Sequence, residues 1–189
     1  MDLLNTIKDD QSRTSLLGRK NNLMILELTG KQAENFKQTL RVVKVWAKNR
    51  GISSNALGYL GGISWAILVA KICQIFPHHK PAKLLHEFFV IYSIWNWKVP
   101  VRLTPLPANT IEDKNPSLMS VITPASEYNS TERVNAITYK VLFEEIRRAT
   151  EILLSRKDLS EVCKKADFFG TFPLYVEIDI NGQNTCKDD

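Results

Sequence analysis

The sequence predicts a mainly α-helical protein, in which a helical domain is followed by an incomplete α+β domain. Three observations support this fold class. Apolar residues recur at helical spacing along residues 31–97, with no alternating strand pattern between them. Five prolines then interrupt residues 99–129, which indicates an extended connection or a domain boundary. The only strongly alternating segment comes late in the chain, as L-Y-V-E-I-D-I at 174–180.

The bulk composition is that of a soluble globular protein. The 189 residues suffice for one domain, or for a small domain and part of a second. They are 44% hydrophobic and 24% charged, and no apolar run is long enough to span a bilayer. The first thirty residues carry charges but no apolar core of a signal peptide. A net charge of +5 fits either a polyanionic partner or a solvated basic surface, and no membrane partner is expected.

The first predicted helix covers residues 31–50 and is stopped by Gly51. Its cations recur at i, i+4, i+7 and i+11 and therefore share one narrow stripe: Lys37, Arg41, Lys44 and Lys48. This stripe is either the wall of a cleft that holds an anion or the solvated face of an amphipathic helix.

A glycine-rich segment then leads into an apolar helix that ends before Pro77. Gly58, Gly61 and Gly62 work against helix formation, so a bare backbone must be needed there. Asn55 is of a residue type that caps helix N-termini, where amide groups favour a negative group or a close-lying ring. Tight packing of helices is the alternative explanation.

Further helices are predicted at residues 81–97 and 131–156 from their apolar spacing. The strand at 174–180 has no partner strand in the pattern. We therefore expect the chain to stop inside an α+β domain, unless this strand pairs with residues 1–30 or with another molecule.

Metal-site signals in the sequence are weak. The three cysteines, Cys73, Cys163 and Cys186, are few and far apart, which is typical of reduced thiols in a cytosolic or nuclear protein. With the histidines they form no ligand spacing, so no metal site is predicted from His78, His79 and His86. Glu177 and Asp179 share one strand face, as a metal-binding pair would, but a solvent-facing edge is favoured because no phosphate-binding loop precedes them.

Long segments of the chain resemble the central helical domain of eukaryotic poly(A) polymerases. The resemblance is carried mainly by R-V-V-K-V-W-A-K-N-R-G-I-S-S-N-A-L-G-Y-L-G-G-I-S-W-A-I-L-V-A at 41–70. Shorter matches follow in the family's order: V-I-T-P-A at 121–125, N-S-T at 129–131 and A-D-F-F at 166–169. The segment S-L-L-G at 15–18 is similar to the family's S-L-N-G, with Leu17 in place of the asparagine.

The resemblance implies a domain plan and an activity. Residues 1–30 would be the end of the catalytic domain, 31–125 the helical central domain, and 126–189 a truncated RNA-binding domain resembling an RRM. The chain is expected to be a fragment of an enzyme that adds AMP from ATP to RNA 3′ ends in the nucleus. Its partners would be ATP, the RNA 3′ end and the missing N-terminal catalytic domain, whose aspartates would bind Mg or Mn. No catalytic or metal-binding residue is assigned to this chain, which alone is expected to be inactive.

The resemblance also assigns nucleotide-binding residues. Lys44 would contact the ATP phosphates, Asn55 would lie near the nucleotide, and Gly62 and Ile63 would pack against adenine. RNA-binding residues stay unknown. Ser53 departs from the family's tyrosine, which puts nucleotide affinity in question.

Two other functions stay open at the level of sequence. One is a fragment of the terminal nucleotidyltransferases outside the poly(A) polymerase group, which share a similar K-x-W-A-K helix. The other is a non-enzymatic RNA-binding or scaffolding module.

Overall fold

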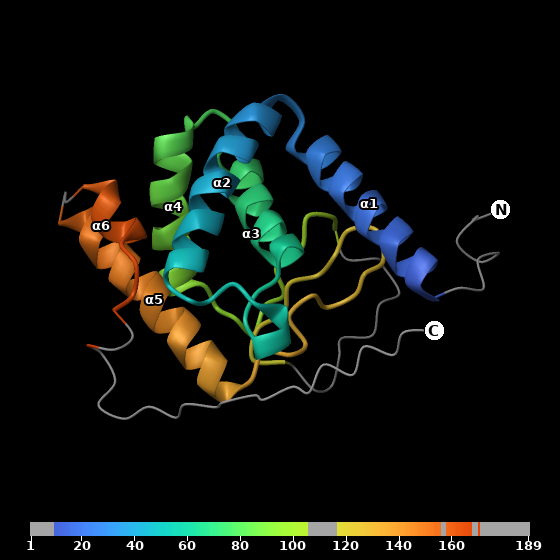
Figure 1. The fold of residues 1–189 in the computed structure, drawn as a ribbon. Coiled ribbons are helices and arrows are strands. Elements are labelled where there is room, and N and C mark those ends of the chain that lie inside the picture. The colour runs from blue at the N-terminus through green and yellow to red at the C-terminus, as the bar shows by residue number, and fades with distance from the viewer. Residues whose placement is uncertain (1–9, 106–116, 156–157, 168–169, 171–189) are drawn as a thin grey trace, which may run out of the picture.

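A computed structural model describes residues 10–105, 117–155, 158–167 and 170 (Figure 1). The predicted strand at 174–180, with Glu177 and Asp179, and Cys186 lie outside these residues. Within them the chain is helical: α1 (Asp10–Thr29), η2 (Gly30–Gln32), α2 (Ala33–Asn49), η3 (Asn55–Leu57), α3 (Gly62–Ile75), α4 (Pro81–Ile94), α5 (Ala136–Leu154) and α6 (Leu159–Cys163). The mainly helical fold class is thereby confirmed.

Helix α3 runs through the middle of the core, with α1, α2 and α4 packed around it (Figure 1). All its residues from Ser64 to Ala70 are buried. Trp46 of α2 meets Trp65 of α3 edge to face, with ring centroids 5.6 Å apart. Such aromatic pairs add stabilisation beyond the burial of their area. The position of α2, and hence of its basic stripe, is set by this contact.

Helices α2 and α3 appear close to where the sequence predicts them, but α1 is not among the predicted elements. It starts ahead of the first predicted helix and lies beside α3 (Figure 1). Two residues anchor it: Ile25 is 1% exposed, and buried Asn21 accepts a 2.9 Å hydrogen bond from the backbone N–H of Ala125.

Helix α4 is shorter than predicted. It ends at Ile94 instead of residue 97, because the chain turns extended at Trp95. Trp97 then folds back and stacks on Tyr92, with ring centroids 5.5 Å apart. Burial of Trp97 in the core is incompatible with continuing the helix.

The described part of the proline-rich connection contains no helix and is held by backbone hydrogen bonds. Val101 donates to Ser120 O at 2.8 Å, and Ile122 donates to Val101 O at 3.0 Å. The chain then turns back on itself, so that Thr123 N–H donates to Tyr128 O at 2.9 Å. This places residues 123–130 beside α1 and α3.

Helix α5 begins five residues later than predicted, at Ala136 rather than residue 131. Asn135 and Thr138 form a reciprocal capping box that fixes this start. The helix packs on α4, where Thr150 Oγ1 donates to Phe89 O at 3.0 Å. The domain boundary predicted after residue 125 stays a prediction, and α5 shares the core of the preceding helices.

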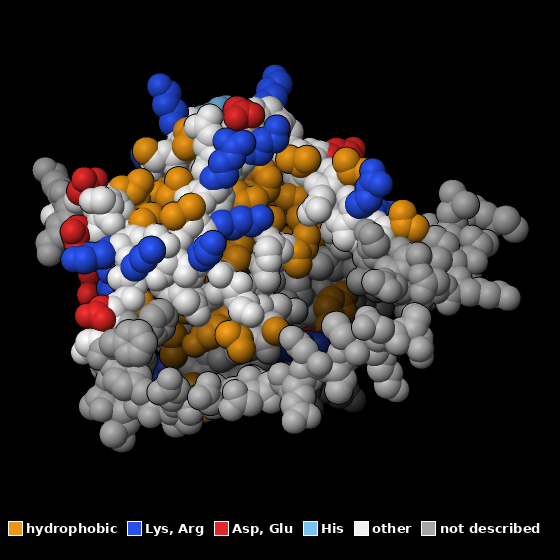
Figure 2. All heavy atoms as spheres, in the orientation of Figure 1, with side chains coloured by type: hydrophobic (Ala, Val, Ile, Leu, Met, Phe, Trp, Pro, Cys, Tyr) orange, Lys and Arg blue, Asp and Glu red, His pale blue; other side chains and the backbone are white. Residues whose placement is uncertain are grey.

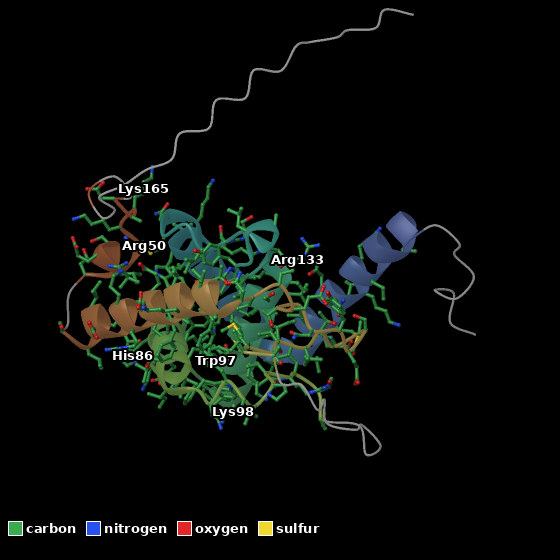
Figure 3. The ribbon with its side chains drawn as sticks, turned by 90° about the horizontal axis from the view of Figure 1, so that it is seen from below. Arg50, His86, Trp97, Lys98, Arg133 and Lys165 are labelled. Carbon is green, nitrogen blue, oxygen red and sulfur yellow. The ribbon has the colours of Figure 1, made fainter. Side chains whose placement is uncertain are left out.

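The C-terminal end of α2 is tied to α5 and to the segment after α6. Arg50 donates from Nε and Nη2 to the two carboxylate oxygens of Glu145, each at 2.8 Å, and from Nη1 to Lys164 O at 3.2 Å. Asn49 Nδ2 donates to Cys163 O at 2.7 Å. Figure 3 shows Arg50 beside α5 and α6. We call this group the α2 clamp.

Within the described residues, no helix combines the length and apolar character needed to cross a membrane.

Candidate functional site

A cavity of about 740 Å³ opens between α1, α2, the start of α3 and the loop 123–130. Its volume is within the range of small-molecule sites. All four residues that the sequence assigns to nucleotide binding line it: Lys44, Asn55, Gly62 and Ile63. Figure 2 shows apolar side chains on the face between α1 and α2, with Lys and Arg side chains beside them.

The start of α3 combines two sources of positive potential. Gly61 precedes the helix with an extended backbone and Gly62 is its first residue, so the unpaired amides of the first turn lie at the cavity. The Lys44 ammonium is also there, since its Nζ lies 3.8 Å from where a Cβ on Gly62 would be. No described carboxylate lies within ion-pair distance of Lys44 Nζ. The arrangement favours an anion.

Two glycines of the segment, Gly58 and Gly62, have different reasons to be glycine. Gly58 has a φ of +81°, and a Cβ on it would lie 3.0 Å from Arg133 O, so the turn itself requires glycine. At Gly62, by contrast, an added Cβ would meet only Lys44 Nζ, at ordinary contact distance. Helix packing therefore gives no reason for Gly62, and an added side chain there would project toward the cavity.

Asn55 does not cap α3, contrary to what its residue type predicts. It begins the short turn η3, and Gly61 occupies the capping position of α3 instead. The Asn55 side chain lies next to Gly61, whose Cβ position is 3.5 Å from Asn55 Cβ. It remains at the cavity rim, exposed.

Of the basic stripe on α2, only Lys44 lines this cavity. Lys37 pairs with Glu34 at 3.6 Å, and Lys48 is exposed. Arg41 lines a separate groove of about 370 Å³ between α2 and α6. Thus the cleft interpretation describes Lys44, whereas Lys37 and Lys48 belong to a solvated face.

Sequence reasoning missed the wall that α1 contributes. Leu17, Asn21 and Ile25 line the cavity and succeed one another at intervals of four residues, so they share one face of α1. This four-residue spacing is the signal in the sequence from which a helix with one face toward the cavity could have been predicted. On the opposite side, Phe36 and Leu40 of α2 make the wall apolar.

The loop 123–130 supplies the polar wall, to which no site role was assigned from the sequence. Thr123 Oγ1 lies 2.8 Å from Ser126 Oγ and accepts a 3.1 Å hydrogen bond from Tyr128 N–H. The Tyr128 side chain is half exposed at the cavity. A hydrogen bond with Glu132 raises the pKa of the Tyr128 phenol above its ordinary value.

The remaining sequence candidates lie elsewhere. Ser53 is exposed and does not line the cavity. His79 stacks on Phe76 with ring centroids 4.9 Å apart, and His86 lies 3.6 Å from Glu87. In the described ranges, no three His, Cys, Asp or Glu side chains are grouped so that they could hold a metal ion.

Comparison with known proteins identifies what the chain is similar to. The family model described as "Poly(A) polymerase central domain" matches residues 35–166. The poly(A) polymerase of Dictyostelium discoideum is 39% identical over 192 residues, covering 93% of this chain and 23% of that protein. The nuclear poly(A) polymerase 2 of Arabidopsis thaliana is 35% identical over 188 residues, covering 91% and 23%. The chain thus spans about a quarter of the length of these relatives.

Solved structures share the fold at low sequence identity. A cytoplasmic RNA terminal U-transferase superposes with a TM-score of 0.65 at 16% identity, covering 78% of this chain and 63% of the other. Cid1, with RNA terminal uridylyl transferase activity, gives 0.67 at 17% identity, covering 78% and 61%. At these identities the likeness concerns the fold alone.

Proposed function

Because this chain belongs to the poly(A) polymerase family, through its central domain, we propose that it provides the nucleotide-binding wall of a polynucleotide adenylyltransferase. The parent protein would transfer AMP from ATP to the 3′ end of RNA, in the nucleus. The observation that carries the proposal is the convergence of Lys44, Asn55, Gly62 and Ile63 on one cavity. The curated relatives, which are poly(A) polymerases, support the reaction.

The phosphates of ATP would lie where Lys44 meets the start of α3. A free ammonium and the unpaired amides of a helix N-terminus both favour negative charge, and the two are adjacent here. A charge-assisted contact of this kind holds a phosphate more strongly than a neutral hydrogen bond.

The adenine would lie over the backbone of Gly62 and against Ile63. A flat ring can approach a peptide plane closely only where no Cβ intervenes, and the Cβ direction of Gly62 is open. Asn55, exposed beside Gly61, would lie near the nucleotide. This accounts for a glycine that the fold does not need.

The divalent metal of such a reaction finds no fitting ligand set in the part of the chain that the structure describes. We therefore assign no metal-binding or catalytic residue and derive no chemical step here. The RNA 3′ end is a proposed partner of the parent protein, without assigned contacts. Inactivity of this chain alone stays a prediction, checked by primer extension with Mg or Mn.

The test pairs a binding measurement with a folding measurement on Gly62→Val. In the 189-residue chain the substitution should change the melting temperature little, because the added side chain projects toward the cavity. In ATP titrations of the same chain it should abolish measurable binding, since the side chain occupies the place of the base. A large fall in melting temperature would return Gly62 to a packing role, and unchanged ATP binding would refute the proposed adenine position. Failure of the unsubstituted chain to bind ATP would favour a scaffolding module.

A further inference from the structure

Asn21 is a buried amide whose orientation is fixed. Only 5% of the residue is exposed, yet it lines the cavity from α1. Its Oδ1 accepts a hydrogen bond from the Ala125 N–H at 2.9 Å. An asparagine amide has one acceptor and one donor side, so this contact determines which way the group is turned. The Nδ2 donors face away from Ala125.

Asn21 contacts the loop through Ala125, but its Nδ2 group has no hydrogen-bond partner among the described residues. Asn21 is nevertheless one of the residues that line the cavity. Buried donors are normally paired with protein, water or ligand. This donor is therefore available to whatever the cavity holds.

The surroundings of Asn21 determine which part of a nucleotide can reach it. Apart from Asn22, the side chains that line the cavity near Asn21 on α1 and α2 are apolar, among them Ile25, Phe36 and Leu40. A triphosphate there would lose its hydration without gaining a cation. The cation that lines the cavity among the described residues, Lys44, lies at the start of α3 instead. A neutral base that lies over the Gly62 backbone, as proposed above, can present its ring acceptor atoms to Asn21 on the α1 side of the same cavity.

The position of Asn21 on α1 also has a meaning in this sequence. The resemblance described above expects an asparagine at position 17, where this chain has Leu17. Leu17 has no donor, but Asn21 is four residues further along the same helix and lines the same cavity. Asn21 thus presents to the cavity, from the same face of α1, a side-chain amide that Leu17 lacks.

We propose that Asn21 is a specificity-determining residue whose Nδ2 donates a hydrogen bond to a ring nitrogen of the adenine. This inference rests on the proposed function, because it needs a nucleotide in the cavity. It adds a base-reading contact from α1 to the phosphate contact from Lys44.

The experiment compares ATP with 1-deaza-, 3-deaza- and 7-deaza-ATP, each of which replaces one ring nitrogen by carbon. Binding is measured on the 189-residue chain and on Asn21→Asp, which keeps the oxygen that accepts from Ala125 but removes the donor. The unsubstituted chain should bind one of the three analogues more weakly than ATP, by up to about tenfold for one hydrogen bond. Asn21→Asp should bind that analogue and ATP equally. Asn21→Ala, which adds no charge, should show the same loss of discrimination.

Controls separate charge from hydrogen bonding. Leu23→Asp places the same charge two residues along α1, at an exposed position outside the cavity lining, and should retain full discrimination between ATP and the analogue. Discrimination that persists in both Asn21 variants, or that appears only against 2′-deoxy-ATP, would overturn the inference. If the chain binds ATP in a Lys44-dependent way while Asn21 has no effect, only the inference fails. If the chain binds no ATP, the proposed function fails and the inference with it.

Discussion

Two basic residues near the end of α2 have opposite environments. Arg50, in the α2 clamp, is enclosed: its guanidinium meets both oxygens of Glu145 at 2.8 Å and a backbone carbonyl of residue 164. Lys44, fewer than two helical turns earlier, has no described carboxylate within ion-pair distance, although it lies beside a helix N-terminus that also repels cations.

The difference separates a charge that holds the fold from an unpaired charge that we propose to bind a ligand. A guanidinium that is paired in this way stabilises the native state, and its removal leaves a partner uncompensated. An ammonium held near positive potential contributes nothing comparable to folding, so another reason must explain its place. The cavity and the clamp should therefore respond differently to substitution.

The largest effect on stability is expected at the clamp. Arg50→Met should lower the free energy of unfolding by about 2 to 4 kcal/mol, because Glu145 is largely buried and retains only Arg148 at 3.1 Å. Urea denaturation measures this. Arg147→Met is the matched control, since the exposed pair of Arg147 with Glu151 should contribute less than about 1 kcal/mol. If Arg50→Met weakened ATP binding without lowering the free energy of unfolding, the distinction between the α2 clamp and the cavity would be contradicted.

The next effect should appear in ATP use and leave folding unchanged. In the complete enzyme, Lys44→Ala should weaken ATP affinity or use roughly tenfold to a hundredfold, the equivalent of about 1.5 to 3 kcal/mol. Lys48→Ala, one helical turn further and exposed, should have little effect. Steady-state kinetics with varied ATP test both. Equal and small effects would mean that the whole stripe is a solvated face.

The glycines provide a smaller contrast of the same kind. Gly58→Ala should destabilise the chain by about 1 to 2 kcal/mol, because a Cβ is strained at φ +81° and approaches Arg133 O. Gly62→Ala should fold almost normally and be detected only by weaker nucleotide binding. Thermal unfolding of the two variants tests this contrast. If Gly62→Ala were less stable than Gly58→Ala, the Cβ direction at Gly62 could not be open.

The smallest effect is expected at the thiol of Cys73, which is buried in the hydrophobic core. Burial raises the pKa of the Cys73 thiol from an ordinary 9.0 to about 11. The folded thiol keeps its proton where the unfolded one loses it, so stability falls as the pH rises from about 9 toward 11. Between pH 8 and 10 the loss should be about 1 kcal/mol larger than in Cys73→Ala. Measuring the free energy of unfolding at both pH values tests this. The control Cys163→Ala should keep the steeper loss of stability that the unsubstituted chain shows.

Local patterns were sufficient for the parts of the site that lie close together in sequence. Helix α2 is readable from its period and from Gly51, and the glycine segment follows directly. The resemblance carried by this continuous segment names Lys44, Asn55, Gly62 and Ile63 together, and they are found lining one cavity. Their contacts with a nucleotide stay proposals.

What escaped prediction depends on contacts between distant segments. The wall from α1 is joined to the loop by the Asn21–Ala125 hydrogen bond, which spans 104 residues. No local period reports such a contact. The end of α4 is set by the stacking of Trp97 on Tyr92, again a tertiary event. The start of α5 is different, because the N-x-x-T capping signal at Asn135 is present in the sequence but was not used, and apolar spacing alone placed the start too early.

The closure of the cavity also has a consequence for the order of folding. Its last wall is joined through Asn21–Ala125 and through Ser64 Oγ, which donates to Ser130 Oγ at 2.9 Å across 66 residues. On the ribosome, chains grow at about 5 to 20 residues per second, so the N-terminal helices emerge seconds before this wall. Pairings between such distant segments are also formed late in folding, since long loops must close first. A nascent chain therefore acquires its helices well before it acquires a pocket, and a nucleotide bound as proposed would stabilise only the finished domain.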